Sequence, residues 1–312
     1  LAATLLVSER FYAPFDDLPD DWGMREGGAL DREAAIRDAH GNIELLVAGV
    51  SRTGTTSMKL VLGSLGFTTV HFKEMLDNHF EFFYAYLHGM LREPDMRRVF
   101  ARWPAGTVLL DCPVPLMFQD LFASFPRAKV LLTTRLDETW LASYEKYYAA
   151  TFLYRWTDRL DLLLVSYISR ALRLHTLLRV LGVRGVRTTK PTLEQLPDLI
   201  SLYRKTDELL YGSHVPNAFW PAKARHYQDL VRRTVPQDQL VEVDVSNGSI
   251  DLLISRLGVN GSGSPVEFPR AFRSKDVAAQ SYQAHWLETN HRHILCAWGA
   301  VAVLMSLPMT LW

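Results

Sequence analysis

Short apolar runs alternate with amphipathic helical patterns through the middle of the chain. Five of these runs are rich in Leu or β-branched residues and are bounded by Gly, Pro or charge: residues 43–50, 67–72, 106–112, 128–135 and 239–245. Runs of this length and composition predict strands, and the helical patterns between them predict βα units. We therefore expect an α/β protein whose central parallel sheet is covered by helices on both faces.

The segments outside this regular alternation differ in character. Residues 1–42 are of mixed character and are interpreted as an N-terminal extension, and the main domain is expected over residues 43–292. Between the fourth and fifth predicted strands, about residues 153–235 form a long, mostly helical insertion in this interpretation. Residues 160–178 within it have apolar positions at helical spacing, which fits a helix packed on its own domain or one lying on a bilayer surface.

The apolar C-terminal stretch suggests a membrane anchor. No charged residue occurs from Ile294 to Trp312, and a helix rising ~1.5 Å per residue would nearly cross a hydrocarbon core of ~30 Å. We therefore interpret residues 293–312 as a single-pass C-terminal transmembrane helix in contact with lipid, in an endomembrane or in a mitochondrial or plastid membrane. The alternative is a buried core helix that Pro308 breaks or kinks near its end.

The overall charge and the cysteine count restrict the possible partners. The chain has 34 Lys plus Arg and 34 Asp plus Glu, so its net charge gives no reason to expect a nucleic acid. Cys112 and Cys296 are the only cysteines, and they support neither a disulfide framework nor a cysteine-based metal site. Any anion site must therefore be local.

The turn after the first predicted strand has the composition of a phosphate-binding loop. In the sequence GVSRTGTTS, Gly49 and Gly54 bracket the turn, and a helix beginning near Thr55 offers hydroxyls and its positive dipole end. The spacing matches nucleotide hydrolases, but Thr55 stands where their lysine follows the second glycine. A kinase or nucleotide hydrolase is therefore disfavoured, and Arg52 is expected to supply the cation. The alternative is a strand-to-helix turn that holds no ligand.

A second motif completes a family resemblance. The loop SRTGTTS resembles the 5'-phosphosulfate loop of P-loop sulfotransferases that use 3'-phosphoadenosine 5'-phosphosulfate, in the branch with Arg where cytosolic members have Lys. After the fourth predicted strand, TTRLDETWLASYEKYY places Arg135 eight residues before Ser143, the arrangement with which the family holds the 3'-phosphate. Further similarity extends over about residues 44–275. The resemblance implies a P-loop NTPase-like three-layer fold.

The resemblance also implies roles for single residues. It assigns the 5'-phosphosulfate of the cofactor to the loop residues Arg52, Thr53, Gly54, Thr55, Thr56 and Ser57. It assigns the 3'-phosphate to Arg135 and Ser143. It also implies that the later basic segment with Arg270 closes over the cofactor; the alternative is a solvated basic loop. The family reaction requires no metal.

Sulfuryl transfer also needs a group that removes the acceptor's proton. Asp111 is our first candidate because it follows the third predicted strand, and ligands of parallel sheets bind at the carboxyl ends of strands. His71, at the end of the second strand, is an alternative or a supporting group. Cys112 is expected to be a small packed residue, and Arg52 to stabilise charge on the leaving phosphate.

Two hypotheses for the function follow from these assignments. The first is a membrane-anchored sulfotransferase-like protein that transfers a sulfuryl group to a hydroxyl or amine acceptor. The second is a non-catalytic accessory subunit of the same fold, whose partners are the other subunits of a membrane complex. The sequence leaves the activity, the acceptor and the organelle open.

Overall fold

The computed structural model describes eight parts of the chain: residues 42–91, 95–150, 166–167, 169–170, 195–246, 250–257, 294–299 and 302. The predicted N-terminal extension lies outside these residues, apart from residue 42 at its end. The same holds for much of the first half of the predicted insertion and for Arg270.

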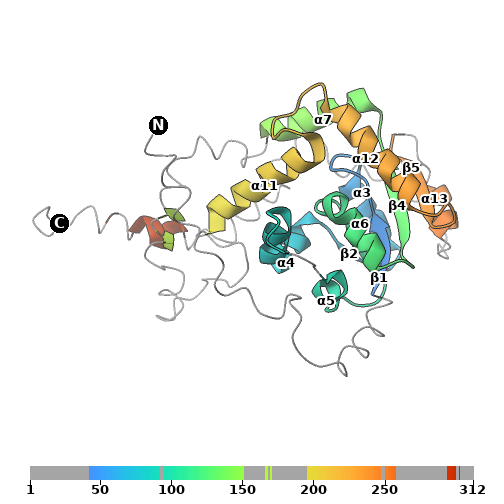
Figure 1. Ribbon diagram of the computed structural model, residues 1–312, viewed down its shortest axis with the longest axis horizontal. Helices are drawn as coiled ribbons and strands as arrows, with labels where there is room; N and C mark the ends of the chain where they lie inside the picture. The colour runs from blue at the N-terminus through green and yellow to red at the C-terminus, as the bar shows by residue number, and fades with distance from the viewer. Residues whose placement is uncertain are drawn as a thin grey trace, which may run out of the picture.

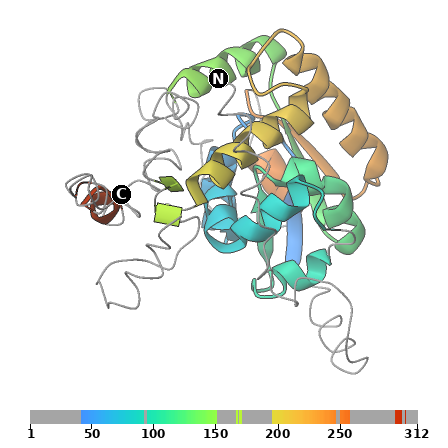
Figure 2. The ribbon, with the colours of Figure 1, turned by 60° about the vertical axis from the view of Figure 1, so that its left-hand side comes forward.

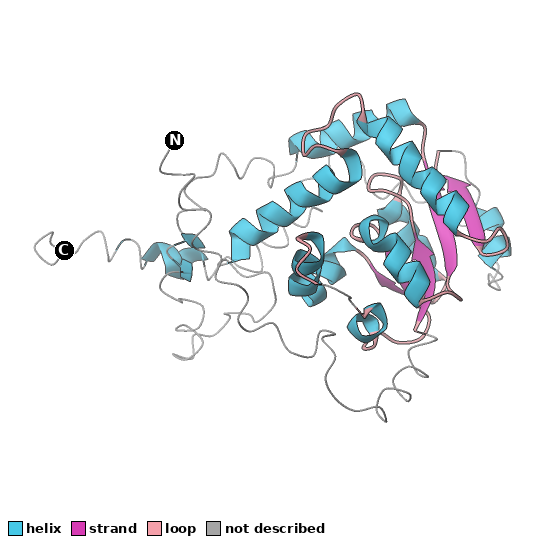
Figure 3. Ribbon diagram, in the orientation of Figure 1, coloured by secondary structure: helices cyan, strands magenta, loops and turns pink. Residues whose placement is uncertain are grey.

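A five-stranded parallel sheet forms the centre of the fold (Figures 1 and 3). Its strands are β1 (Ile43–Val47), β2 (Thr68–Val70), β3 (Thr107–Leu110), β4 (Lys129–Thr134) and β5 (Leu240–Asp244). All five lie within the predicted runs. Their order across the sheet is β2-β3-β1-β4-β5, so β1 pairs with β3 on one side and with β4 on the other. The loops after β1, β3 and β4 therefore meet at one edge of the sheet.

The sheet separates two apolar cores, which confirms the predicted three-layer α/β fold. Successive side chains of a strand point to opposite faces, and Leu45 and Val47 of β1 pack with α3 (Thr55–Ser64) and α13 (Ile250–Leu257). Leu46 belongs to the larger core on the other face. Further helices in the described parts of the chain are α4 (Phe72–Leu87), α5 (Met96–Phe100), α6 (Val114–Ser124), α7 (Asp137–Ala150), α11 (Leu196–Tyr211) and α12 (Trp220–Thr234).

A buried aromatic cluster joins α7 to α11 and α12. Helix α12 contacts both α7 and α11, and the three helices can be followed in Figures 1 and 2. Trp220 is fully buried, and its ring stacks on Tyr211 at a centroid distance of 4.2 Å. Tyr144 of α7 meets Trp220 edge-on at 4.9 Å. Each such ring contributes about 1.5–3 kcal/mol through burial alone. The cluster therefore fixes α7, the helix that follows β4, against the rest of the domain.

The predicted transmembrane helix is contradicted by the structure. None of the helices in the described parts of the chain is both long and apolar enough to cross a bilayer. Within residues 293–312, the structure describes residues 294–299 and 302 as helical, and the others lie outside the described residues. Ala297 is buried, and Ile294 and Cys296 pack against the larger core. The prediction of a membrane location, which rested on the apolar composition of this segment, was wrong.

Candidate functional site

The loop between β1 and α3 contains two glycines that its shape requires, Gly49 because a side chain would collide with β4 and Gly54 because of its backbone conformation. A Cβ atom on Gly49 would lie 1.7 Å from Oγ1 of Thr133 in β4. Gly54 has a φ of +80°, in the left-handed region that favours glycine, and its Cβ would lie 3.0 Å from a methyl group of Val245. α3 begins directly afterwards at Thr55, as predicted. The glycine spacing therefore reflects the close approach of β4 and of the segment after β5.

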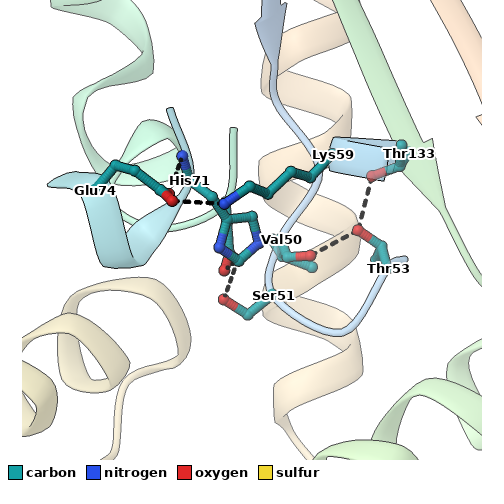
Figure 4. A network of polar contacts seen from close by, with 8 residues as sticks. Val50, Ser51, Thr53, Lys59, His71, Glu74 and Thr133 are labelled. Carbon is teal, nitrogen blue, oxygen red and sulfur yellow. Dashed lines mark hydrogen bonds and ion pairs between the residues drawn. The ribbon is translucent and has the colours of Figure 1, made fainter. Parts of the chain in front are cut away.

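Thr53 holds the loop in shape through its side chain and its amide (Figure 4). Its hydroxyl donates to the carbonyl oxygen of Val50 at 2.6 Å, and its Oγ1 lies 2.8 Å from Oγ1 of Thr133. The amide of Thr53 also donates to Val50, at 3.2 Å. Because Thr53 is buried and its hydroxyl is bonded within the protein, the structure places it as a support of the loop.

The first turn of α3 carries the other predicted phosphate contacts. Thr55 and Ser57 are buried and Thr56 is partly exposed. No acidic residue occurs in this turn, so the positive end of the helix dipole meets no carboxylate from its own first turn. The start of α3 can therefore receive an anion.

Arg52 reaches from the loop to α7. Its Nε and Nη2 atoms lie 3.3 and 3.1 Å from the hydroxyl oxygen of Ser143, to which both donate. Its guanidinium carbon lies 5.2 Å from the ring centroid of Tyr147, a cation–π contact. Burial lowers the pKa of Arg52, and electrostatic interactions with Tyr147 and Asp111 partly oppose this. Arg52 stays cationic at neutral pH, because the ordinary pKa of an arginine side chain lies far above 7.

Arg135 lies beside Arg52, as the strand order requires. Its Nη1 atom donates to the main-chain oxygen of Arg52 at 3.5 Å, and its Nε donates to Thr139 at 3.2 Å. Among the described residues, no carboxylate forms an ion pair with Arg135. The positive charge of Arg135 also contributes to the lowered pKa of Arg52, after the larger effect of burial. Arg52, Arg135 and Ser143, from two βα junctions, thus form one cationic cluster.

Asp111 lies between the loop and His71. One carboxylate oxygen accepts a hydrogen bond from the hydroxyl of Ser51 at 2.9 Å, and the other lies 3.2 Å from Nε2 of His71. The His71 atom is close to the carboxylate but not aligned for a hydrogen bond. Burial lowers the pKa of His71, although the charge of Asp111 raises it. The imidazole is therefore neutral at neutral pH.

His71 is itself held by an ion pair (Figure 4). Glu74 accepts from the main-chain amide of His71 at 3.1 Å and from Lys59 of α3 at 2.6 Å. Burial raises the pKa of Glu74, but Lys59 and the main-chain amides outweigh burial, and the net pKa is lowered. Glu74 is thus an anion that fixes the start of α4 against α3.

The comparison with known proteins agrees with this geometry. A family model described as "Sulfotransferase domain" matches residues 44–277. The chain belongs to this sulfotransferase domain family. It is also 26% identical over 125 residues to "Ava biosynthesis cluster protein M" of Aspergillus versicolor, and this match covers 37% of the chain and 47% of that protein. The match spans about half the length of this relative. The predicted family is confirmed.

The sulfotransferase domain contains positioning contacts that the sequence analysis did not identify. Trp140 of α7 is buried, and its indole N–H donates to the main-chain oxygen of Ser51 at 2.9 Å. Lys59 and Glu74 were also missed. The position of Glu74, three residues after the helix-capping His71, was a usable signal because a Glu there often bonds back to the cap residue. The tryptophan contact gave no such signal, since it depends on the strand order.

Two further predictions concern residues at the margin of the site. Cys112 is buried, as expected for a packed residue, and burial raises the pKa of its thiol. Arg270 lies outside the described residues. Among the residues that the structure describes, no group of three or more His, Cys, Asp or Glu side chains could hold a metal ion.

Proposed function

We propose that this sulfotransferase domain transfers a sulfuryl group from 3'-phosphoadenosine 5'-phosphosulfate to a hydroxyl or amine acceptor. The convergence of Arg52, Arg135 and Ser143 is the observation that carries this proposal. At the carboxyl end of a parallel sheet, next to a glycine-bracketed loop, the guanidinium of Arg52 donates to Ser143, and that of Arg135 donates to the main-chain oxygen of Arg52. Such a cluster is suited to a ligand with several phosphate or sulfate groups.

The residues present fit this cofactor. The main-chain amides at the start of α3, with Thr55 and Thr56, would hold the 5'-phosphosulfate, and Arg135 with Ser143 would hold the 3'-phosphate. Arg52 belongs to the loop and donates to Ser143, so it links the residues proposed for the 5'-phosphosulfate to those proposed for the 3'-phosphate. When bound, the cofactor supplies the sulfuryl group and a phosphate leaving group.

The protein's contribution to the transfer is electrostatic and positional. Arg52 and the dipole of α3 stabilise the negative charge that develops on the leaving phosphate. Arg52 acts as a charge and not as a proton donor, because a guanidinium keeps its proton. Such preorganised charge is commonly the largest contribution in transfers of this kind, which demand positioning more than covalent chemistry.

Asp111 is the proposed acceptor of the proton that leaves the attacking hydroxyl or amine. Its carboxylate is 13% exposed and lies at the same sheet edge as the cationic cluster. One of its oxygens accepts from Ser51 and the other lies beside the neutral His71, so the Ser51 hydroxyl holds the carboxylate from one side. His71 supports Asp111 by filling the space next to it with a neutral, polarisable ring.

The proposal is tested by turnover of the full chain. The protein is incubated with 3'-phosphoadenosine 5'-phosphosulfate and a panel of phenols, alcohols and amines, and release of 3'-phosphoadenosine 5'-phosphate is measured by chromatography. We expect acceptor-dependent release that the Asp111→Asn variant lowers by about 100-fold or more, as is typical for loss of a general base. Absence of release with every acceptor class, from a folded protein that binds the cofactor, would contradict the proposal.

A further inference from the structure

Ser51 is the point at which three parts of the sheet edge meet. It lies in the loop after β1, one residue before Arg52. Its main-chain oxygen accepts from Trp140 of α7 at 2.9 Å, and its hydroxyl donates to Asp111 after β3 at 2.9 Å. β1 lies between β3 and β4 in the sheet, so the loop after β1 is next to the segments that follow both of these strands. Ser51 therefore connects the phosphate loop to the proposed base.

The backbone on both sides of this hydrogen bond is in an uncommon conformation. Arg52 has a φ of 72° and Asp111 a φ of 67°, and these are the two non-glycine residues with positive φ among those described. Each such residue costs about 1–3 kcal/mol, so it persists only where the surrounding contacts hold it. The hydrogen bond joins Asp111 to Ser51, the residue directly before Arg52, across the sheet edge.

We propose that Ser51 is a positioning residue, which holds the carboxylate of Asp111 in its ionised form and turned toward the phosphate loop. The inference rests on the proposed function, since it concerns the base of that reaction. A hydroxyl that donates to a carboxylate stabilises the anion and restricts its rotation. The hydrogen bond thereby keeps the base at a constant place relative to the loop that would hold the sulfuryl donor.

The first test needs no cofactor. The carboxyl carbon of Asp111 is followed by carbon-13 NMR as the pH is changed, and its signal is assigned by its loss in Asp111→Asn. The titratable groups that face Asp111 are His71, Arg52, Cys112 and Tyr211. All four are kept in the Ser51 variants, so the difference between variants isolates the hydroxyl.

We expect Ser51→Ala to move the titration midpoint of Asp111 upward by about one pH unit, the equivalent of one charge-assisted hydrogen bond. Ser51→Thr, which keeps the hydroxyl, should leave the midpoint near the wild-type value. Ser64→Ala is the matched control, because its hydroxyl donates to a main-chain oxygen at 2.7 Å within the last turn of α3. If Ser51→Ala does not fold, Ser51→Cys replaces it, since a thiol is a weak donor. An unchanged midpoint in the hydroxyl-free variant overturns the inference.

The second test separates the inference from the proposed function. Binding of 3'-phosphoadenosine 5'-phosphate is measured by calorimetry, and kcat is measured with an acceptor found in the turnover screen. We expect Ser51→Ala to keep the affinity within about threefold and to lower kcat by about tenfold, since one hydrogen bond to a charged group is lost. If the wild type shows no turnover but the midpoint of Asp111 moves, the proposed function fails and the positioning contact stands. If turnover is present and the variant changes neither kcat nor the midpoint, the inference fails and the proposed function stands.

Discussion

Gly49→Ala should destabilise the domain strongly, because the new methyl group has no room. The added carbon would lie 1.7 Å from Oγ1 of Thr133, 2.6 Å from Oγ1 of Thr53 and 2.9 Å from Cβ of Thr133. Thr133 is fully buried in β4, so it has no space into which to turn. The substitution must therefore shift β4 or break the contact between Thr53 and Thr133.

The magnitude follows from these two costs. Overpacking a well-packed core costs about 1–3 kcal/mol, and loss of a buried hydrogen bond adds about 1–3 kcal/mol when a polar group is left unsatisfied. We therefore expect Gly49→Ala to lower the free energy of unfolding by about 2–5 kcal/mol. This is a large share of the ~5–15 kcal/mol that holds a typical domain together.

Urea unfolding of the full chain, followed by circular dichroism, measures this change. Gly63→Ala is the matched control, because Gly63 lies inside α3 with nothing within 4 Å of the added carbon. It should raise the stability by about 0.5–1 kcal/mol, since alanine favours a helix over glycine. Thr133→Ala should recover part of the loss in the Gly49→Ala background, because it removes the closest atom.

Equal and small effects of Gly49→Ala and Gly63→Ala would show that the loop has room for a side chain at residue 49. The same conclusion would follow if Thr133→Ala destabilised both backgrounds by the same amount, because a direct collision requires the two sites to be coupled. In either case the glycine would not be needed for the approach of β4 to the loop.

Two other perturbations test the surroundings of the site. Trp140→Phe keeps a buried ring but removes the hydrogen bond to Ser51. It should lower the free energy of unfolding in urea by about 1 kcal/mol and weaken binding of 3'-phosphoadenosine 5'-phosphate a few-fold. Unchanged stability would show that the indole N–H does not hold the loop. His79 accepts a hydrogen bond from the indole of Trp103. Burial, followed by the charge of Arg102, lowers the pKa of His79 to about 3. Between about pH 6.5 and pH 3, the unfolded chain therefore binds a proton at His79 that the folded chain does not bind. Stability should fall as the pH drops through this window, by up to ~1.4 kcal/mol per pH unit from this residue, and His79→Gln should make the fall shallower; an identical pH dependence in the variant would contradict this.

The sequence predicted the elements of the fold because each strand is a short buried run with clear ends. All five strands were found, and the loop helix begins at the predicted residue, Thr55. The order of the strands could not be read from the same pattern, since hydrophobic periodicity gives the burial of a strand and not its neighbours. The tail was misjudged for a related reason, because apolar composition suits both a membrane helix and a packed one.

The candidate site was predictable where a motif carried it. Arg52, Arg135 and Ser143 were named from two spaced motifs. In the structure the side chain of Arg52 contacts Ser143, and the side chain of Arg135 contacts the main chain of Arg52. The contacts of Ser51 and Trp140 could not be predicted, because they exist only when β1 lies between β3 and β4. Their roles follow from topology and from the partners that buried polar groups need.

Binding of 3'-phosphoadenosine 5'-phosphate tests the proposed cofactor site without any knowledge of the acceptor. Isothermal calorimetry on the full chain would compare the wild type with Arg52→Ala, Arg135→Ala and Arg127→Ala. Arg127 is the control, since it is exposed and precedes β4, whereas Arg135 follows it. We expect the first two variants to bind about 10- to 100-fold more weakly, because each loses charge-assisted hydrogen bonds of about 1.5–3 kcal/mol, and Arg127→Ala to bind as the wild type does. No binding by the folded wild type, or equal losses in all three variants, would contradict the proposed cofactor site.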